Sequence, residues 1–226
     1  MPKDTETIKI RKSRFNVSLF LAEFLRTYHT TGAVLPSSRW LAKALALNVK
    51  HVDKPSEPRS ILEVGPGTGA VTEKIVRAMQ PGDRLDLVEL NDRFVARLRD
   101  RLEQESAFRA VAPRTRILHC KVEDLPQDKK YDLIVSGLPL NNFSTKEVQH
   151  ILKVLMSFLK PAGVLSFFQY IGIRKVKALV SQGHDRKRLR EIGQVLADFF
   201  KGRETRRDWI WLNVPPAWVH HIRHSR

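Results

Sequence analysis

The stretch Ile61-Leu62-Glu63-Val64-Gly65-Pro66-Gly67-Thr68-Gly69 decides the fold of this chain. Its first half is short and mostly apolar, as is typical of a strand that is covered on both faces. The glycines at 65, 67 and 69 permit positive φ and a close approach of the backbone to a ligand. Residues 70–79 have the apolar spacing of a helix. The sequence therefore predicts a strand, a ligand-binding loop and a helix in direct succession.

Two carboxylates make this pattern more specific. Glu63 lies just before the first glycine, where it could face a cationic ligand. Glu89 ends the next apolar run, 85–89, at the position from which an acidic residue reaches ribose hydroxyls. Together they resemble the class I S-adenosylmethionine (SAM) methyltransferases more than the nicotinamide-binding proteins, which more often show G-x-G-x-x-G. The resemblance implies SAM as the cofactor and an α/β fold, a Rossmann-like seven-stranded sheet with an N-terminal helical extension.

Composition and charge limit the function classes. With 226 residues, 42% hydrophobic and 28% charged, the chain can form one α/β domain with a substantial core. A net charge of +16 predicts a polyanionic partner, either nucleic acid or an anionic membrane surface, or else a solvated basic surface. Cys120 is the single cysteine, which excludes an internal disulfide and fits a reducing compartment.

Membrane-spanning and secretion signals are not expected. Residues 162–173 form the longest nearly apolar run, which is too short to span a bilayer. The first residues lack the apolar region of a signal peptide. We therefore expect a cytoplasmic protein that is soluble or peripheral on the inner face of the membrane.

Residues 1–60 are expected to form a separate unit that precedes the SAM-binding domain at 61–226. Within this unit, 12–28 has the spacing of a helix with two apolar stripes, followed by a second helix and a linker with prolines. One stripe contains Phe15 and Leu19 and lies among basic side chains. Such a helix either lies in a membrane interface or buries both of its stripes within the protein.

Two further motifs narrow the resemblance. They are Gly32-Ala33-Val34-Leu35-Pro36-Ser37-Ser38 and Ser136-Gly137-Leu138-Pro139-Leu140. Both are similar to segments of the bacterial phospholipid N-methyltransferases, which convert phosphatidylethanolamine towards phosphatidylcholine. The resemblance implies a membrane aminolipid substrate: phosphatidylethanolamine, its methylated intermediates or an ornithine lipid. It also implies anionic membrane lipids as partners, with neither a nucleic acid nor a stable protein partner.

Two other functions remain open. An rRNA adenine N6-dimethyltransferase fits the positive charge, but that class has Asn or Asp, then Pro, then an aromatic residue in its acceptor loop. Here Leu140 follows Pro139, although Phe143 lies a few residues further on, and a helical C-terminal RNA domain has no room. A scaffold that binds SAM without catalysis would need a vestigial cofactor loop, and nothing between Glu63 and Gly69 is damaged.

The expected cofactor-binding residues lie before the second helix, in the glycine loop and at the ends of predicted strands. They are Ser37, Glu63, Gly65, Gly67, Thr68, Gly69, Glu89, Leu90, Val122, Glu123, Ser136 and Leu138. In related methyltransferases an acidic residue after the third strand often meets the adenine amino group. Lys121 stands at the closest alignment, so we expect the backbone of Val122 and the side chain of Glu123 to take that role.

The acceptor amine must be neutral to attack a methyl group, and burial beside a cationic cofactor favours its neutral form. Side chains expected to contact the amine or take its proton are Tyr28, Asn141, His150, Gln169 and Tyr170, with His29 as an alternative proton acceptor. No metal site is expected, because the histidines at 220, 221 and 224 lack carboxylate or cysteine partners at ligand spacing in the sequence.

Overall fold

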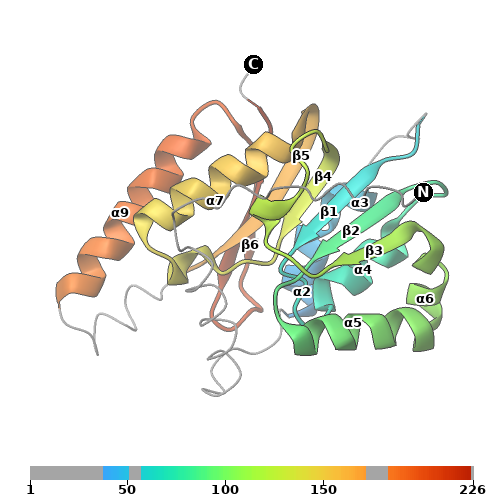
Figure 1. Ribbon diagram of the computed structural model, residues 1–226. Helices are drawn as coiled ribbons and strands as arrows, with labels where there is room; N and C mark the ends of the chain where they lie inside the picture. Colours follow the sequence, from blue (N-terminus) through green and yellow to red (C-terminus); the bar gives the residue numbers. More distant parts are fainter. Residues whose placement is uncertain (1–37, 51–56, 172–182, 225–226) are drawn as a thin grey trace, which may run out of the picture.

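A single seven-stranded sheet organises the chain. The computed structural model describes residues 38–50, 57–171 and 183–224, with the backbone alone for 183–189. The strands follow the order β3-β2-β1-β4-β5-β7-β6 (Figure 1). They are β1 (Ser60–Val64), β2 (Arg84–Val88), β3 (Thr115–Leu118), β4 (Tyr131–Ser136), β5 (Leu159–Tyr170), β6 (Glu204–Ile210) and β7 (Ala217–Ile222). Strands β1 to β5 are parallel and β7 is antiparallel to β5 and β6, which confirms the predicted sheet.

Helices connect the strands on both faces of the sheet. The helices described are α2 (Arg39–Leu45), α3 (Leu47–Lys50), α4 (Ala70–Ala78), α5 (Asp92–Gln104), α6 (Ser106–Arg109), α7 (Thr145–Phe158) and α9 (Gly183–Phe200), with short 3₁₀ turns η1 (Ala112–Arg114), η2 (Val122–Asp124) and η3 (Leu140–Asn142). Helix α7 begins with a capping box between Ser144 and Glu147, which the sequence Ser144-Thr145-Lys146-Glu147 itself indicates. No helix in the described ranges has the length and apolar character needed to cross a bilayer.

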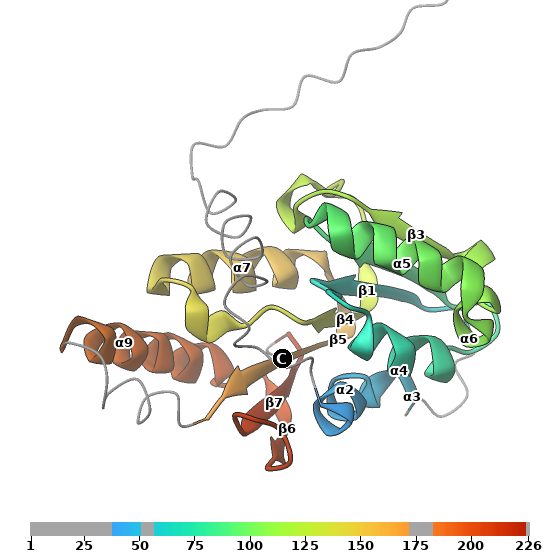
Figure 2. The same ribbon diagram turned by 90° about the horizontal axis from the view of Figure 1, so that it is seen from below.

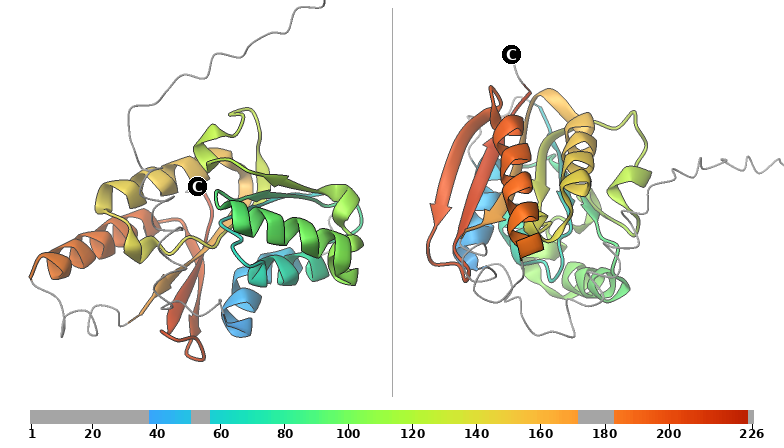
Figure 3. Two further views of the ribbon diagram at one scale, coloured as in Figure 1. Left: turned by 60° about the horizontal axis from the view of Figure 1, so that its bottom comes forward. Right: turned by 90° about the vertical axis from the view of Figure 1, so that its left-hand side faces the viewer.

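The sheet separates two hydrophobic clusters. On one face, α2, α4, α5 and α6 pack against the strands, and residues such as Leu41 and Ile75 are fully buried there. On the other face lie α7 and α9, with Leu155 and Phe158 in the core. Figures 2 and 3 show α7 and α9 on one side and α4 with α2 on the other. Alternate strand residues therefore belong to different clusters, as in any sheet covered on both faces.

Several element boundaries differ from the sequence prediction. The sequence predicts one helix over 39–47, which the structure divides into α2 and α3. It also predicts a third strand over 114–120, which the structure ends at Leu118. Strand β5 begins at Leu159, five residues before the predicted start at Val164, because β4 pairs with it on both sides of an irregularity. The helix expected over 174–180 lies outside the described residues.

Candidate functional site

The candidate site lies at the carboxyl ends of β1, β2 and β4. The chain leaves β1 towards α4 on one face of the sheet and leaves β4 towards α7 on the other. Open α/β sheets bind their ligands at such a switch point, because the two loops diverge and leave a crevice between them. The loops are tied to the sheet there, since the amide of Gly65 donates to the Val88 carbonyl at 2.9 Å and that of Gly137 donates to Val64 at 2.8 Å.

Glycine is required in the loop after β1 for two separate reasons. Gly65, Gly67 and Gly69 all have positive φ, at 71°, 56° and 83°. A Cβ on Gly65 would also lie 2.8 Å from the side chain of Leu138, in the loop after β4. The backbone of this loop is therefore kept free of side chains where it faces the crevice, as the sequence pattern predicts.

Arg101 holds the glycine loop from outside, a contact that the sequence does not predict. Its guanidinium donates to the carbonyls of Thr68 and Gly69 at 3.1 and 2.7 Å. It also pairs with Glu105 at 2.6 Å, one turn further along α5. In the sequence Arg101 has the spacing of an ordinary surface ion pair with Glu105, so no local signal distinguishes it. Its contact with the loop depends on how α5 packs beside α4.

Glu89 joins the glycine loop to the loop after β2. Its Oε2 accepts a hydrogen bond from the Gly67 amide at 3.0 Å, and its Oε1 accepts from the amides of Leu90 and Asn91 at 2.8 and 2.9 Å. Burial raises the pKa of Glu89, although these amide donors oppose the shift. The carboxylate thus lies beside the loop, in the position from which the sequence analysis expects it to bind a ribose.

Glu63 is a fully buried carboxyl group with unused acceptors. Neither of its oxygens, nor the nearby Thr72 hydroxyl, has a hydrogen bond to any of the described residues. Burial raises the pKa of Glu63 to about 8, and the charge of Glu89 adds to the shift while Thr72 and Arg101 oppose it. A buried polar group without a partner is unfavourable unless a ligand satisfies it. Glu63 therefore marks a place for a cationic or hydrogen-bond-donating ligand group.

The remaining predicted cofactor residues lie around the same crevice or outside the described ranges. Ser136 ends β4, is buried, and its hydroxyl accepts from the Leu138 amide at 3.4 Å. Leu138 packs over Gly65, and Leu90 follows Glu89. Ser37 precedes the first described residue, so its predicted role stays a prediction.

The turn η2 carries the two residues predicted to meet the adenine. Val122 is buried, whereas the side chain of Glu123 is partly exposed. Nε2 of His150, on α7, lies 3.7 Å from Oε1 of Glu123. The structure therefore pairs His150, a candidate proton acceptor, with the residue expected beside the adenine. The roles of both residues stay predictions.

Asn141 and Tyr170 come together at the predicted acceptor position. Oδ1 of Asn141, in η3, accepts a hydrogen bond from the Tyr170 amide at 3.1 Å at the end of β5. Asn141 is buried, and burial raises the pKa of the Tyr170 hydroxyl, which keeps it neutral. Because strand side chains alternate, Gln169 and Tyr170 point to opposite faces of the sheet. Tyr28 and His29 lie outside the described residues.

The histidines of β7 have carboxylate partners that the sequence spacing hides. Nδ1 of His220 lies 2.6 Å from Glu204, and Nε2 of His221 lies 3.1 Å from Asp208, both on the neighbouring strand β6. Within the described ranges no three His, Cys, Asp or Glu side chains come close enough together to hold a metal ion. These pairs therefore act as links between the two antiparallel strands.

Comparison with known proteins identifies the fold. The O-methyltransferase from Bacillus cereus, solved in complex with SAH, matches with a TM-score of 0.59 and 13% identity, over 95% of this chain and 93% of that one. Residues 61–163 match the family described as "Methyltransferase domain". The fold is thus that of the class I, SAM-dependent methyltransferases.

Curated proteins similar to this chain are also named as methyltransferases, but their names differ in the molecule that is methylated. The ornithine lipid N-methyltransferase of Singulisphaera acidiphila is 27% identical over 148 residues, which is 66% of this chain and 74% of that protein. The ubiquinone/menaquinone biosynthesis C-methyltransferase of Ectopseudomonas mendocina is 28% identical over 111 residues, but these are 49% of this chain and only 41% of that protein. The chain is therefore a SAM-dependent methyltransferase, whose acceptor these relatives leave unassigned.

The residues at the crevice fit SAM as the cofactor. Gly65, Gly67 and Gly69 leave the backbone bare, Glu89 borders the loop, and the unbonded Glu63 carboxyl offers a partner to a cationic group. When bound, SAM supplies a methyl group carried on a positively charged sulfur. The protein's part is to bind it, exclude water and orient the acceptor.

Proposed function

We propose that this protein is an N-methyltransferase that acts on the amine head group of a membrane aminolipid. The substrates would be phosphatidylethanolamine and its methylated intermediates towards phosphatidylcholine, or an ornithine lipid. Support comes from the similarity to a protein named ornithine lipid N-methyltransferase, which the chain matches over 74% of its length. The motif Ser136-Gly137-Leu138-Pro139-Leu140, at the exit of β4, supports the same substrate class by resemblance.

One observation at the acceptor loop favours an aminolipid over an RNA adenine as the methyl acceptor. The ring best placed in the sequence to stack a base is Phe143, and it is fully buried in the hydrophobic core. Leu138 and Leu140 on either side of Pro139 are buried as well. A flipped base needs an exposed aromatic or apolar platform on which to stack. An alkylamine needs none, so the burial of Phe143 favours an amine on a flexible chain.

The groups at the end of β5 suit a neutral amine. Tyr170 has a hydroxyl that burial keeps uncharged, and the Asn141 side chain fixes the backbone of Tyr170. A neutral hydroxyl can accept a hydrogen bond from the amine and stabilises its protonated, unreactive form less than a carboxylate would. In this proposal Tyr170 orients the nitrogen, Asn141 positions Tyr170, and His150 receives the proton.

A lipid acceptor also determines the partner and the location in the cell. We propose that the protein binds anionic lipids at the cytoplasmic face of the membrane as a peripheral enzyme, which agrees with its net charge of +16. The helix expected over 12–28 lies outside the described residues, so its role at the interface stays a prediction.

Labelled SAM tests the proposal directly. The purified full chain is incubated with labelled SAM and, in parallel, with total bacterial lipid or with total bacterial RNA, and the labelled product is identified by mass spectrometry. We expect label in an aminolipid amine and none in RNA. Label in adenine, or in neither fraction, would reject the aminolipid function. The Glu89→Ala variant serves as the control for cofactor-dependent transfer.

A further inference from the structure

The turn between β6 and β7 forms an exposed apolar tip on the protein. The five large apolar side chains that are exposed among the described residues are Trp40 (40%), Trp209 (45%), Trp211 (63%), Leu212 (68%) and Val214 (73%). Four of them lie in the segment 209–214, and the fifth lies at the start of α2. Residues 209–219 contain no charged side chain. We call residues 209–214 together with Trp40 the aromatic tip.

Helix α2 and the hairpin are joined, so the aromatic tip is one surface. The backbone amide of Ser38 donates to Oδ1 of Asn213 at 3.1 Å, and Nδ2 of Asn213 donates to the Pro215 carbonyl at 2.7 Å. Trp209 stacks on Trp211, with ring centroids 3.9 Å apart. Figures 2 and 3 show the hairpin beside α2 from different directions. These contacts hold the apolar side chains outward on a rigid support.

The aromatic tip and the candidate site lie at the same end of the sheet, where the parallel strands have their carboxyl ends. Tyr170, at the carboxyl end of β5, pairs with Ala217 at the start of β7. The next amide, of Ile171, donates to the Pro216 carbonyl at 2.6 Å. The turn of the hairpin therefore begins directly beyond the predicted acceptor residue. The tip and the crevice therefore lie at the same end of the strands.

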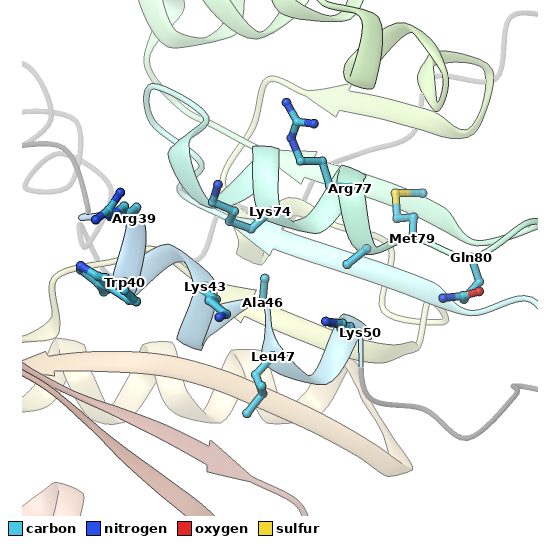
Figure 4. A pocket seen from close by; sticks show the side chains of 11 residues that line it. Arg39, Trp40, Lys43, Ala46, Leu47, Lys50, Lys74, Arg77, Met79 and Gln80 are labelled. Carbon is cyan, nitrogen blue, oxygen red and sulfur yellow. The ribbon is translucent and has the colours of Figure 1, made fainter.

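Basic side chains flank the aromatic tip. A groove of about 940 Å³ runs between α2 with α3 and the helix α4, and it starts at Arg39 and Trp40 (Figure 4). Its lining includes five cations, Arg39, Lys43, Lys50, Lys74 and Arg77, and no acidic residue. Glu73 pairs with Lys74 and Arg77, whereas no ion pair joins Arg39, Lys43 or Lys50 to another described residue. Arg39 and Lys43, which have no ion pair within the described part of the chain, therefore lie near the exposed Trp40.

We infer that the aromatic tip enters the interface of an anionic lipid bilayer while Arg39 and Lys43 contact its head groups. Tryptophan is favoured at membrane–water interfaces because its ring is apolar and its N–H remains hydrated. Cations near an anionic leaflet add attraction, so apolar and basic groups side by side suit a lipid surface better than an apolar protein face. The inference rests on the proposed function, because a lipid acceptor has to be reached from a bilayer at the mouth of the crevice.

Tryptophan fluorescence tests this contact in the full chain. All four tryptophans of the protein, at 40, 209, 211 and 218, lie at or beside the aromatic tip, and the helix expected over 12–28 contains none. Emission therefore reports on the tip even if another segment also binds lipid. With vesicles of phosphatidylglycerol and phosphatidylcholine we expect a blue shift, and quenching when the acyl chains carry bromine near the head group. Binding without quenching would overturn the inference.

Two variants separate the apolar and the basic contributions, and a third is the matched control for the change in charge. Trp211→Ser/Leu212→Ser should lower vesicle affinity about ten-fold or more without lowering the melting temperature, because both side chains are exposed. Arg39→Gln/Lys43→Gln should lower it about ten-fold, since each cation near the surface contributes attraction. Arg84→Gln/Arg109→Gln makes the same charge change at the opposite end of the strands. This control should lower the vesicle affinity less than about three-fold. Equal losses in both charge variants would overturn oriented docking.

Other occupants of the aromatic tip give distinct results. A second copy of the chain would produce a dimer in light scattering that Trp211→Ser/Leu212→Ser dissociates. A cover formed by chain segments outside the described residues would leave the emission blue-shifted and resistant to acrylamide before lipid is added. Either result rejects the inference. Methyl transfer to lipid in detergent micelles is measured separately: transfer without bromolipid quenching rejects only the docking, and quenching without transfer rejects only the proposed function.

Discussion

The Gly67 amide and the Glu89 carboxylate are joined by a hydrogen bond of 3.0 Å across 22 positions of the chain. This bond connects the loop after β1 with the end of β2, so the protein's own contacts join the two predicted halves of the cofactor site. The same carboxylate accepts two further amides, of Leu90 and Asn91. Glu89 therefore shapes the loop, and binding of the ribose by the same carboxylate stays a prediction.

Replacement of Glu89 should weaken SAM binding. A charge-assisted hydrogen bond contributes about 1.5–3 kcal/mol, so Glu89→Ala should lower the affinity about ten-fold or more. Titration calorimetry of SAM binding gives the measurement. Glu103→Ala, on the exposed side of α5, removes the same charge and should leave the affinity unchanged. If SAM binds both variants as tightly as the wild type, Glu89 is not part of the site.

The buried Glu63 predicts that SAM binding is linked to a proton. Its pKa of about 8 means that the carboxyl is mostly protonated at pH 7 in the free protein. A cationic ligand group favours the ionised form, so binding should release close to one proton at pH 7, and affinity should rise by up to about ten-fold per pH unit between pH 6 and 8.

Calorimetry in two buffers of different ionisation enthalpy measures this release. The observed binding enthalpy should differ between phosphate and Tris for the wild type. The Glu63→Gln variant is the control, because it retains any proton released by SAM itself and loses only the contribution of Glu63. The same buffer dependence in both proteins would show that Glu63 does not change its protonation state when SAM binds.

Asn141 and Tyr170 should affect turnover more than cofactor affinity. Asn141→Ala removes the acceptor of the Tyr170 amide, so the end of β5 loses its support and kcat should fall about ten-fold, while the affinity for SAM stays nearly the same. Asn141→Asp keeps an oxygen acceptor and should restore most of the rate. Tyr170→Phe tests the hydroxyl alone. Full activity in both Asn141→Ala and Tyr170→Phe would place the amine elsewhere.

The contribution of His220 to the stability of the fold should be lost in mild acid. Burial lowers its pKa from 6.5 to about 4, although Glu204 opposes the shift. Since the unfolded chain binds the proton more readily, stability is fully present above pH 6.5 and is lost as the pH falls towards 4, by on the order of 3 kcal/mol. His221, whose pKa burial also lowers, acts in the same direction, whereas Glu63 acts in the opposite direction between pH 8 and 4.5.

A variant without the imidazole isolates the contribution of His220. His220→Phe keeps an aromatic ring against Phe200, which lies 4.3 Å from the imidazole between ring centroids. Urea unfolding at pH 7.5 and pH 5 gives the change in the free energy of unfolding between the two pH values, to which Glu63 and His220 contribute with opposite signs. This change should be more favourable to the folded state at pH 5 in the variant than in the wild type, because the variant lacks the His220 contribution. An equal change in the two proteins would show that His220 does not contribute.

The sequence by itself determined the features that depend on neighbouring residues. The strand, the positive-φ loop and the helix at 60–78 follow from short apolar runs and from glycines that alone tolerate this backbone. The capping box before α7 is equally local. Successive βα units have few allowed arrangements, and the resemblance to the class I methyltransferases implied which of them this chain adopts, the seven-stranded sheet.

Only the tertiary structure decided which distant side chains meet. Arg101 reaches Thr68 and Gly69 because α5 packs beside α4, and the His220–Glu204 pair forms because β6 and β7 pair in one register. The burial of Phe143 and the exposure of Trp211 cannot be read from residue type, since both are large aromatic side chains. Hydrophobicity determines that apolar residues are buried on average, but the packing of each element decides which of them stay at the surface.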